Sequence, residues 1–331
     1  MSEAPFPLSS EVLAGDTSDV YFLRTNRVME LEGVNPRVAM EAFPSGDGIL
    51  CGMKEVLALL GKSLPADGEV WGLAEGEPFR SKEIVLRIVA PYLSFGIYET
   101  AILGILAHES GWATAARECV EAARGLPIVS FGARHVHPAV AGAMDYAAVV
   151  GGCVSCSTPL GARLAGVSPS GTMPHAMILC FGDTVRAAVA FDKHMPPEVP
   201  RIVLVDTFHD EPEEALKVAE ALGDRLYGVR LDTPGERGGV TPDLVKEARA
   251  RLDLAGFQHV RIFVSGGVTP ARIREFLEVG APVDSFGVGS YISGASPIDF
   301  TADIKEVEGQ PVAKRGRIPG VIANPRLQRA I

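Results

Sequence analysis

Short apolar runs alternate with longer amphipathic segments along most of the chain after about residue 127. Most of the runs end in Gly, Ser, Asp or Thr, and they occupy residues 126–132, 147–153, 167–175, 201–207, 226–233, 260–267 and 283–290. Segments with helical periodicity lie between several of them, for example 211–223 and 241–256. Apolar strands joined by crossover helices predict a parallel sheet. About seven such units favour a closed or nearly closed α/β barrel, and an open doubly wound sheet is the alternative.

The N-terminal third has a different pattern. Residues 38–44 alternate like a strand, residues 81–93 are apolar but contain Pro91, and residues 94–123 have the periodicity of a helix. This mixture predicts an α+β domain at 1–115, followed by the barrel at 116–297. The periodicity stops after about residue 298, and the segment 298–331 is expected to pack back on the N-terminal domain.

Two charges interrupt the apolar run "LYGVRLDT" at its end. Arg230 and Asp232 are two residues apart, so on a strand they project from the same face. A charge removed from water is costly unless it is paired or contacts a ligand. The pair either forms a structural ion pair or belongs to a binding site.

The other predicted strands also end in residues that can do chemistry. In α/β barrels ligands bind at the carboxyl ends of the strands, which form one rim. Polar or aromatic residues at nearly every strand end therefore favour an active site over isolated structural roles. These residues are Phe131, Arg134, the stretch 155–158, His175, Asp206, Arg230, Asp232, the stretch 265–267 and the stretch 287–290.

The last two runs end in glycine-rich turns that suit a phosphate group. Glycines leave backbone N–H groups accessible, and barrels commonly bind phosphate after strands 7 and 8, although such turns also serve tight packing. The residues expected to bind phosphate are Ser265, Gly266, Gly267, Gly287, Gly289 and Ser290. A P-loop signature is absent from the sequence.

Carboxylates and an aromatic residue suggest what lies beside the phosphate. Asp206 and Asp232 could face sugar hydroxyls, a Mg²⁺ ion or a developing positive charge. Phe131 and Arg134 combine a flat apolar face with a planar cation, which suits an aromatic ring that bears a carboxylate.

Composition excludes several classes of protein. A net charge of −10 and a pI near 5.3 argue against general binding to nucleic acid or to an anionic membrane. No apolar run reaches the roughly 18 residues of a membrane span, and the N-terminus lacks the pattern of a secretion signal, so a cytoplasmic location is expected. Cys153 and Cys156 form a C-x-x-C pair, but no second ligand pair accompanies them, and no protein-held metal site is predicted.

The motifs in their order resemble nicotinate phosphoribosyltransferase. The resemblance rests on "SFGARHVHP", "VGGCVSCSTPLGARLAGVSPSGTMPHAMI", "LVDTFHD", "GVRLDT", "FVSGGVT" and "FGVGSYI", and it extends over about residues 15–321. It implies an irregular parallel α/β barrel with an N-terminal α+β domain. It also implies transfer of phosphoribosyl from phosphoribosyl pyrophosphate to nicotinate, with Mg²⁺ as cofactor and ATP as co-substrate.

The resemblance also implies residue roles. Phe131 matches the aromatic that stacks on the pyridine ring, and Arg134 matches the arginine that binds its carboxylate. His175 matches a histidine that is phosphorylated when ATP drives the reaction.

Asp206 and Asp232 match carboxylates near the ribose and the reacting centre. Arg230 lies on the nicotinate side, and Thr158 stands where nicotinamide-using relatives carry an aspartate.

Both ends of the chain contribute to the resemblance. In relatives the tyrosine matching Tyr21, which follows Asp19, comes from the neighbouring subunit, so a homodimer with shared active sites, or a higher homo-oligomer, is expected. The basic residues Lys314, Arg315 and Arg317 resemble a region that handles pyrophosphate or ATP phosphates. Position 135 is His where many relatives have Arg.

Rival functions remain. Quinolinate phosphoribosyltransferase shares the architecture but needs more basic residues for its second carboxylate, and a nicotinamide-using enzyme is a second rival. A non-catalytic barrel that binds a phosphorylated metabolite is the rival from another class.

Overall fold

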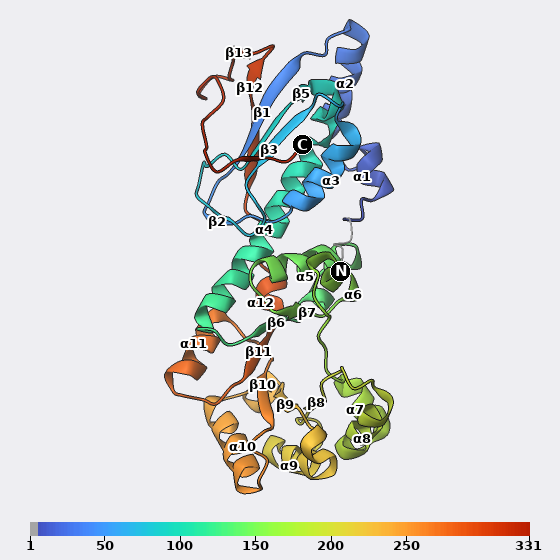
Figure 1. The fold of residues 1–331 in the computed structure, drawn as a ribbon, viewed down its shortest axis with the longest axis vertical. Coiled ribbons are helices and arrows are strands. Elements are labelled where there is room, and N and C mark those ends of the chain that lie inside the picture. The colour runs from blue at the N-terminus through green and yellow to red at the C-terminus, as the bar shows by residue number, and fades with distance from the viewer. Residues whose placement is uncertain (1–5) are drawn as a thin grey trace. The chain divides into compact units, whose positions relative to one another are not determined.

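A computed structural model describes residues 6–331, which divide into two compact units (Figure 1). Unit 1 contains the chain up to Thr114 and again from Ala295 to the end, and unit 2 runs from Ala115 to Gly294. Among the described residues, no helix has both the length and the apolar character needed to cross a bilayer.

Unit 1 is built on a six-stranded sheet in the order β13-β12-β1-β5-β3-β14. Its strands are β1 (Arg37–Pro44), β3 (Glu69–Gly72), β5 (Leu86–Pro91), β12 (Phe300–Val307), β13 (Gln310–Pro311) and β14 (Gln328–Arg329). The central strand β1 pairs antiparallel with β5 and β12. The C-terminal segment therefore supplies three strands to this sheet. Two further strands, β2 (Gly48–Ile49) and β4 (Pro78–Phe79), form a small separate ladder.

The helices of unit 1 bury apolar side chains against this sheet. They are α1 (Ser10–Ala14), α2 (Val20–Glu32), α3 (Met53–Ser63) and the first half of α4 (Glu99–Ala122), with the 3-10 helices η1 (Tyr92–Ser94) and η2 (Gly96–Tyr98). Val56 and Leu59 of α3 join Ile102 and Leu106 of α4 in one buried cluster with β1, β3 and β5. These spacings of three and four residues place each apolar set on one helix face.

Unit 2 contains a parallel six-stranded sheet in the order β7-β6-β11-β10-β9-β8. Its strands are β6 (Ile128–Ser130), β7 (Ser155–Cys156), β8 (Ile202–Leu204), β9 (Gly228–Leu231), β10 (Arg261–Val264) and β11 (Ser285–Val288). The core strands are almost wholly buried, as expected for a parallel sheet covered by helices.

Helices connect the strands of unit 2. They are α5 (Ala141–Val150), α6 (Pro159–Ala165), α7 (His175–Phe181), α8 (Thr184–His194), α9 (Glu211–Leu222), α10 (Pro242–Leu254), α11 (Pro270–Glu278) and α12 (Ser290–Ser293). Short 3-10 helices occur at η3 (Ala133–His135), η4 (Pro138–Val140), η5 (Gly223–Arg225) and η6 (Gly235–Arg237). Pro follows a Thr N-cap at α6, α10 and α11, which is a common start signal for helices.

The prediction of a parallel α/β sheet is confirmed, but the described strands do not form the expected closed or nearly closed barrel. The strands β7 and β8 are the two edges of the sheet, so the described strands make a half-barrel. Two predicted strands are wrong. The run 147–153 lies mostly in helix α5, because an apolar run rich in Ala suits a buried helix as well as a strand. The run 167–175 contains Pro169 and Pro174 and forms no strand, since proline cannot donate to a ladder.

A group of acidic side chains is buried in unit 1 between α3 and α4. Glu109 is 2% exposed, and its carboxyl group shares a hydrogen bond with that of Glu55. The thiol of Cys51 lies 3.4 Å from Oε2 of Glu109. Burial raises the pKa of both Glu55 and Glu109, and the nearby charge of Glu75 raises that of Glu109 further. A shared proton lets two carboxyl groups lie together away from water.

This pair predicts a stability that falls with rising pH. Both folded-state pKa values lie above the unfolded value, so above about pH 4.5 the folded chain binds more protons and loses stability until the folded pKa is passed. Glu109→Gln fixes the neutral form. We expect the stability of this variant to fall less steeply with rising pH. At pH 8 its Tm should rise by about 2–4 °C for each kcal/mol gained in the free energy of unfolding, and at pH 5 its Tm should change little.

Thermal unfolding between pH 5 and pH 9 checks this prediction. Glu121→Gln, an exposed change on the same helix α4, is the control. An unaltered pH slope in Glu109→Gln would contradict the shared-proton interpretation.

Candidate active site

A cavity of about 470 Å³ in unit 2 lies where the strands of the parallel sheet end. It receives side chains or backbone from the ends of β6, β7, β9, β10 and β11. Its lining residues are Phe131, Ala133, Arg134, His135, Ser157, Thr158, Arg230, Asp232, Ser265, Gly266, Gly267, Gly287, Gly289 and Ser290. The parallel strands bring their carboxyl ends to one edge, so residues that lie far apart in the sequence share one wall.

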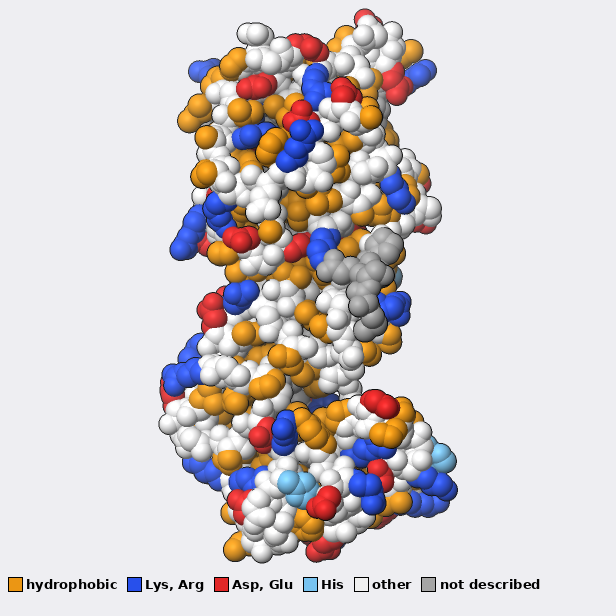
Figure 2. Space-filling view, viewed as in Figure 1, with side chains coloured by type: hydrophobic (Ala, Val, Ile, Leu, Met, Phe, Trp, Pro, Cys, Tyr) orange, Lys and Arg blue, Asp and Glu red, His pale blue; other side chains and the backbone are white. Residues whose placement is uncertain are grey.

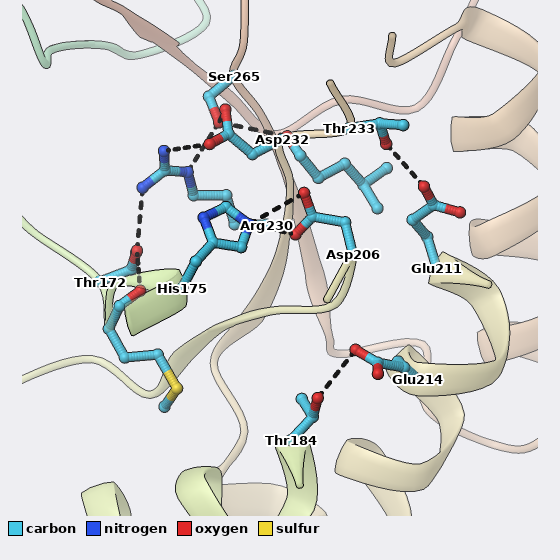
Figure 3. Close-up of polar contacts among 12 residues, drawn as sticks. Thr172, His175, Thr184, Asp206, Glu211, Glu214, Arg230, Asp232, Thr233 and Ser265 are labelled. Atoms are coloured by element: carbon cyan, nitrogen blue, oxygen red, sulfur yellow. Dashed lines mark hydrogen bonds and ion pairs between the residues drawn. The ribbon is translucent and has the colours of Figure 1, made fainter. Parts of the chain in front are cut away.

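Arg230 is the centre of the polar network in this wall (Figure 3). Its Nε donates to Ser265 Oγ at 2.7 Å, one terminal nitrogen donates to Thr172 Oγ1 at 3.1 Å, and the other lies 3.3 Å from Asp232 Oδ2. The hydroxyl of Ser265 in turn donates to Asp232 Oδ1 at 2.8 Å. Both oxygens of Asp232 are therefore oriented by hydrogen bonds, and the two charges found in the sequence do form an ion pair.

The aromatic ring of Phe131 lies against this network. The guanidinium carbon of Arg230 is 4.7 Å from the ring centroid, which is a cation–π distance. A Cβ at Gly287 would lie 2.4 Å from Phe131 Cε2, so the ring can occupy its place only beside a glycine. The ring and the guanidinium together provide two flat surfaces at the cavity.

His175 and Asp206 form a second pair that does not line the cavity, and the charge of Asp232 acts on Asp206. His175 Nε2 lies 3.1 Å and 3.2 Å from the two carboxylate oxygens of Asp206. Burial raises the pKa of Asp206, the contact with His175 opposes this shift, and the charge of Asp232 adds to it. The Asp206 side chain is 2% exposed, whereas that of His175 is 39% exposed. The described hydrogen bonds of the ring both involve Nε2, and Nδ1 has no described partner.

The glycine-rich turns have the backbone conformation that the sequence suggested. Gly266 and Gly267 both have positive φ, at 85° and 62°, which side chains with a Cβ rarely adopt. A Cβ at Gly266 would also lie 3.1 Å from Asp232 Oδ1. Gly289 and Ser290 face the same cavity at the start of α12.

A buried carboxylate fixes the loop that carries Ser157 and Thr158. Asp145 on α5 has no exposed surface. Its Oδ1 accepts from Ser130 Oγ at 2.9 Å, and its Oδ2 accepts from Ser157 Oγ at 3.2 Å and from Thr158 N at 2.8 Å. Thr158 Oγ1 accepts the N–H of Gly161 as the N-cap of α6. Thr158 also lines the cavity, and no acceptor for its hydroxyl proton is described.

Most N–H donors of the Arg134 guanidinium, which lines the cavity, have no described hydrogen-bond partner. Among the described contacts, its single hydrogen bond runs from Nε to His135 Nε2 at 3.4 Å. The ring of His135 also lies 3.2 Å from Ser293 Oγ through Nδ1. The terminal nitrogens of Arg134 thus have no described partner, in contrast to those of Arg230.

The remaining predicted site residues belong to unit 1. Tyr21 is exposed, and its hydroxyl donates to Asp19 Oδ2 at 3.4 Å. Lys314 and Arg317 pair with Asp303 at 3.5 Å and 2.9 Å, while Arg315 is exposed.

Glu99 is influenced by charges from both the N-terminal and the C-terminal segment. Burial raises the pKa of Glu99 to about 7, and the charges of Asp303 and Asp19 raise it while that of Lys314 lowers it. The N-terminal and C-terminal segments therefore lie near one another within unit 1.

The sequence interpretation did not include every residue of the site. His135 lines the cavity but was assigned no role, although it is adjacent to Arg134, and Ser157 was included only as part of the stretch 155–158. Thr172, Asp145 and the carboxylates of α9 act through contacts between distant segments, which no local pattern reveals.

Metal-ligating side chains are not grouped in the described part of the chain. Residues 6–331 contain no set of three His, Cys, Asp or Glu side chains arranged to hold a metal ion. Cys153 and Cys156 are buried free thiols, and burial raises the pKa of each, which makes them unreactive.

Family comparisons cover nearly the whole chain. A family model described as quinolinate phosphoribosyl transferase, C-terminal domain, matches residues 112–303, and the N-terminal domain of the same family matches residues 19–110.

Curated relatives are similar over a shorter stretch. Nicotinate phosphoribosyltransferase pncB2 of Mycobacterium tuberculosis is 34% identical over 230 residues, which cover 68% of this chain and 48% of the relative. Nicotinate phosphoribosyltransferase of Bacillus subtilis is 30% identical over 228 residues, which cover 66% of this chain and 44% of the relative. The chain thus spans about half the length of these relatives.

Solved structures share the fold. A nicotinate-nucleotide pyrophosphorylase from Pyrococcus furiosus is 45% identical, with a TM-score of 0.87 over 97% of this chain and 82% of that one. Human nicotinic acid phosphoribosyltransferase has a TM-score of 0.74 over 92% of this chain and 77% of that one, at 19% identity, which shows likeness of fold alone.

Proposed function

Because the chain belongs to the quinolinate phosphoribosyltransferase family, we propose that it transfers phosphoribosyl from phosphoribosyl pyrophosphate to nicotinate. The products would be nicotinate mononucleotide and pyrophosphate. The curated relatives named nicotinate phosphoribosyltransferase support this substrate, whereas the family model and the likeness to the Pyrococcus furiosus pyrophosphorylase make quinolinate the second candidate.

One observation favours nicotinate over quinolinate. At the cavity the guanidinium of Arg230 already bonds three side chains, whereas the terminal nitrogens of Arg134 have no described partner. A planar guanidinium matches one carboxylate in bidentate geometry. One free guanidinium suits the single carboxylate of nicotinate, while quinolinate would bring a second carboxylate into the cavity.

The charged residues suit a dissociative transfer. Breaking the bond between ribose C1 and the pyrophosphate oxygen sends the electron pair to pyrophosphate and leaves positive charge on the sugar. Asp232, held by Ser265 and Arg230, and the nearby Asp206 would offset that charge. The ring nitrogen of nicotinate then forms the new bond to C1 with its own lone pair. No side-chain base is needed, and positioning supplies much of the rate.

The glycine turns would hold the 5′-phosphate. Gly266 and Gly267 free their backbone N–H groups for an anion, and Gly289 and Ser290, which follow the neighbouring strand β11, line the same cavity.

The donor chemistry of the site fits Mg²⁺ delivered with the substrate. Mg²⁺ prefers oxygen ligands and commonly uses one or two carboxylates together with substrate phosphates. Asp206 and Asp232 would supply the protein oxygens, and the bound ion would neutralise charge on the leaving pyrophosphate.

Unit 1 would complete the site in an oligomer. We propose that the exposed Tyr21, beside Asp19, covers the base in a neighbouring subunit of a homodimer. Arg315, with Lys314 and Arg317, would provide positive charge for pyrophosphate or ATP phosphates, although Asp303 already pairs with the last two.

We propose that His175 couples ATP hydrolysis to this reaction. Asp206 would keep the proton on Nε2, which leaves the Nδ1 lone pair free to attack the γ-phosphorus of ATP as ADP departs with the bonding electrons. We expect His175→Ala to abolish the stimulation by ATP while slow transfer without ATP persists.

The measurement is the ratio of initial rates with and without ATP. His194→Ala, which changes an exposed histidine at the end of α8, serves as the control. Loss of activity by the same factor in both conditions would remove His175 from the ATP step.

The presence of Thr158 at this position predicts that the chain prefers nicotinate over nicotinamide. Thr158→Asp would place a carboxylate opposite that of nicotinate and remove a donor, at a cost of about 2–4 kcal/mol, or roughly thirty-fold to near a thousand-fold in kcat/KM. Because Asp is a good N-cap, α6 should keep its start. Thr158→Asn is the neutral control of similar size, and an equal loss in both variants would show that charge is not the cause.

Steady-state kinetics with three bases test the function as a whole. The chain is assayed with phosphoribosyl pyrophosphate, Mg²⁺ and either nicotinate, quinolinate or nicotinamide. We expect the highest kcat/KM with nicotinate. Faster turnover of quinolinate would reassign the substrate, and no transfer to any base would leave only the non-catalytic binding role.

A further inference from the structure

We propose that Glu211 and Glu214, in the first turn of α9, are positioning residues that hold the loops after both aspartates of the site. This inference rests on the proposed transfer reaction, in which Asp206 and Asp232 face the reacting sugar. The two glutamates lie outside the cavity lining, so they would act through the loops they bind.

Both side chains are buried although they are ionisable. Glu211 and Glu214 are each 2% exposed, whereas Glu213 between them is exposed and pairs with Lys217 on the surface. A buried carboxylate is costly unless strong donors satisfy it. The position at a helix N-terminus favours negative charge for all three glutamates, so it does not explain why two of them point inward.

Glu214 binds the loop that follows Asp206. Its Oε1 accepts the backbone N–H groups of Phe208 at 3.0 Å and His209 at 3.1 Å. Its Oε2 accepts the hydroxyl of Thr184 at 3.0 Å. Thr184 is the first residue of α8, and the preceding helix α7 begins at His175. One carboxylate therefore ties the loop after Asp206 to the start of α8, the helix that follows the one carrying His175.

Glu211 binds the loop that follows Asp232. Its Oε1 accepts the hydroxyl of Thr233 at 2.8 Å, and Thr233 is 4% exposed. Its Oε2 lies 3.4 Å from a terminal nitrogen of Arg237, which also pairs with Asp210 at 2.6 Å. The loops after β8 and β9 are thus joined at the start of one helix.

Figure 3 shows how these contacts relate to the site. Asp206 and His175 face each other, Asp232 lies by Arg230 and Ser265, and Glu211 and Glu214 approach from the start of α9 to meet Thr233 and Thr184. The first anchored residue follows Asp232 by one position and Asp206 by two. At such separations, a shift of the loop is transmitted directly to the aspartate.

A purely structural role makes a different prediction from a positioning role. A structural anchor would lower stability, so the apparent kcat would fall only in proportion to the folded fraction and KM would not change. A positioning anchor would lower kcat per folded molecule, beyond any loss of folded chain, while the nicotinate KM is kept, because Phe131 and Arg134 follow β6 and do not contact α9 in any described bond.

The experiment compares alanine variants along one helical turn. Glu211→Ala and Glu214→Ala remove the anchors, and Glu213→Ala is the matched control with the same loss of charge at the same helix end. We expect roughly 10–100-fold lower kcat in the first two, since small misplacements of reacting groups are costly, with nicotinate KM within about threefold. Glu213→Ala should keep both constants.

Amide hydrogen exchange provides a readout that does not depend on activity. The N–H groups of Phe208 and His209 should exchange at least about tenfold faster in Glu214→Ala than in Glu213→Ala, because they lose their acceptor. Glu214→Gln should restore most of the protection and of kcat, since its amide oxygen can accept both N–H groups and its NH₂ can donate to Thr184. If Glu214→Ala does not fold, Glu214→Asp, whose shorter side chain withdraws the carboxylate, replaces it.

Two results would overturn the proposal. Exchange at Phe208 and His209 that matches the Glu213→Ala control would mean that Glu214 does not hold the loop. Equal losses of kcat in all three alanine variants would mean that the anchors act only through charge or stability. A wild-type chain that transfers phosphoribosyl to no pyridine base would instead refute the proposed function, and the exchange comparison would still decide whether Glu214 anchors the loop.

Discussion

A guanidinium group taken out of water needs acceptors on several sides, and Arg230 finds them on three different segments. Ser265 comes from the end of β10, Asp232 follows the same strand as Arg230, and Thr172 comes from the extended segment before α7. These bonds can form only when the strands are in register and the segment 167–174 crosses the sheet edge. The contacts that unit 2 forms when it folds are therefore also the contacts that set the geometry of the cavity.

The rest of the site follows from this arrangement. The stack of Arg230 on Phe131 brings the end of β6 to the network, and Gly287 leaves the space that the ring occupies. Buried carboxylates then secure the loops: Asp145 holds the loop with Ser157 and Thr158. The side chains of the cavity walls are held by these bonds, while donors that could meet a ligand, such as the terminal nitrogens of Arg134, remain available.

Figure 2 shows that, on the face it presents, acidic and basic side chains are interspersed over the surface. The positive charge for an anionic ligand must therefore come from local groups such as the guanidinium of Arg134.

The sequence predicted the cavity better than it predicted the strands. Most residues assigned from strand ends line one cavity, among them Phe131, Thr158 and Ser290, because parallel strands deliver their ends to one edge whatever the details of closure. The segment 147–153 was misread because apolar periodicity alone does not separate a short buried helix from a strand. The roles of Asp145, Glu211 and Glu214 could not be predicted, since they depend on tertiary contacts that include residues 12–30 positions away, namely Ser157, Thr233 and Thr184.

Arg230 works as a three-way bridge and not simply as a positive charge. Kinetics of Arg230→Lys test this role most directly, because lysine keeps the charge but its compact ammonium cannot span three separated acceptors or stack on Phe131 in the same way. We expect a fall of roughly 100-fold in kcat/KM for nicotinate, equivalent to about 2.7 kcal/mol, in a chain that still folds. A variant that stays within about threefold of the wild type would contradict the claim, since charge alone would then be sufficient.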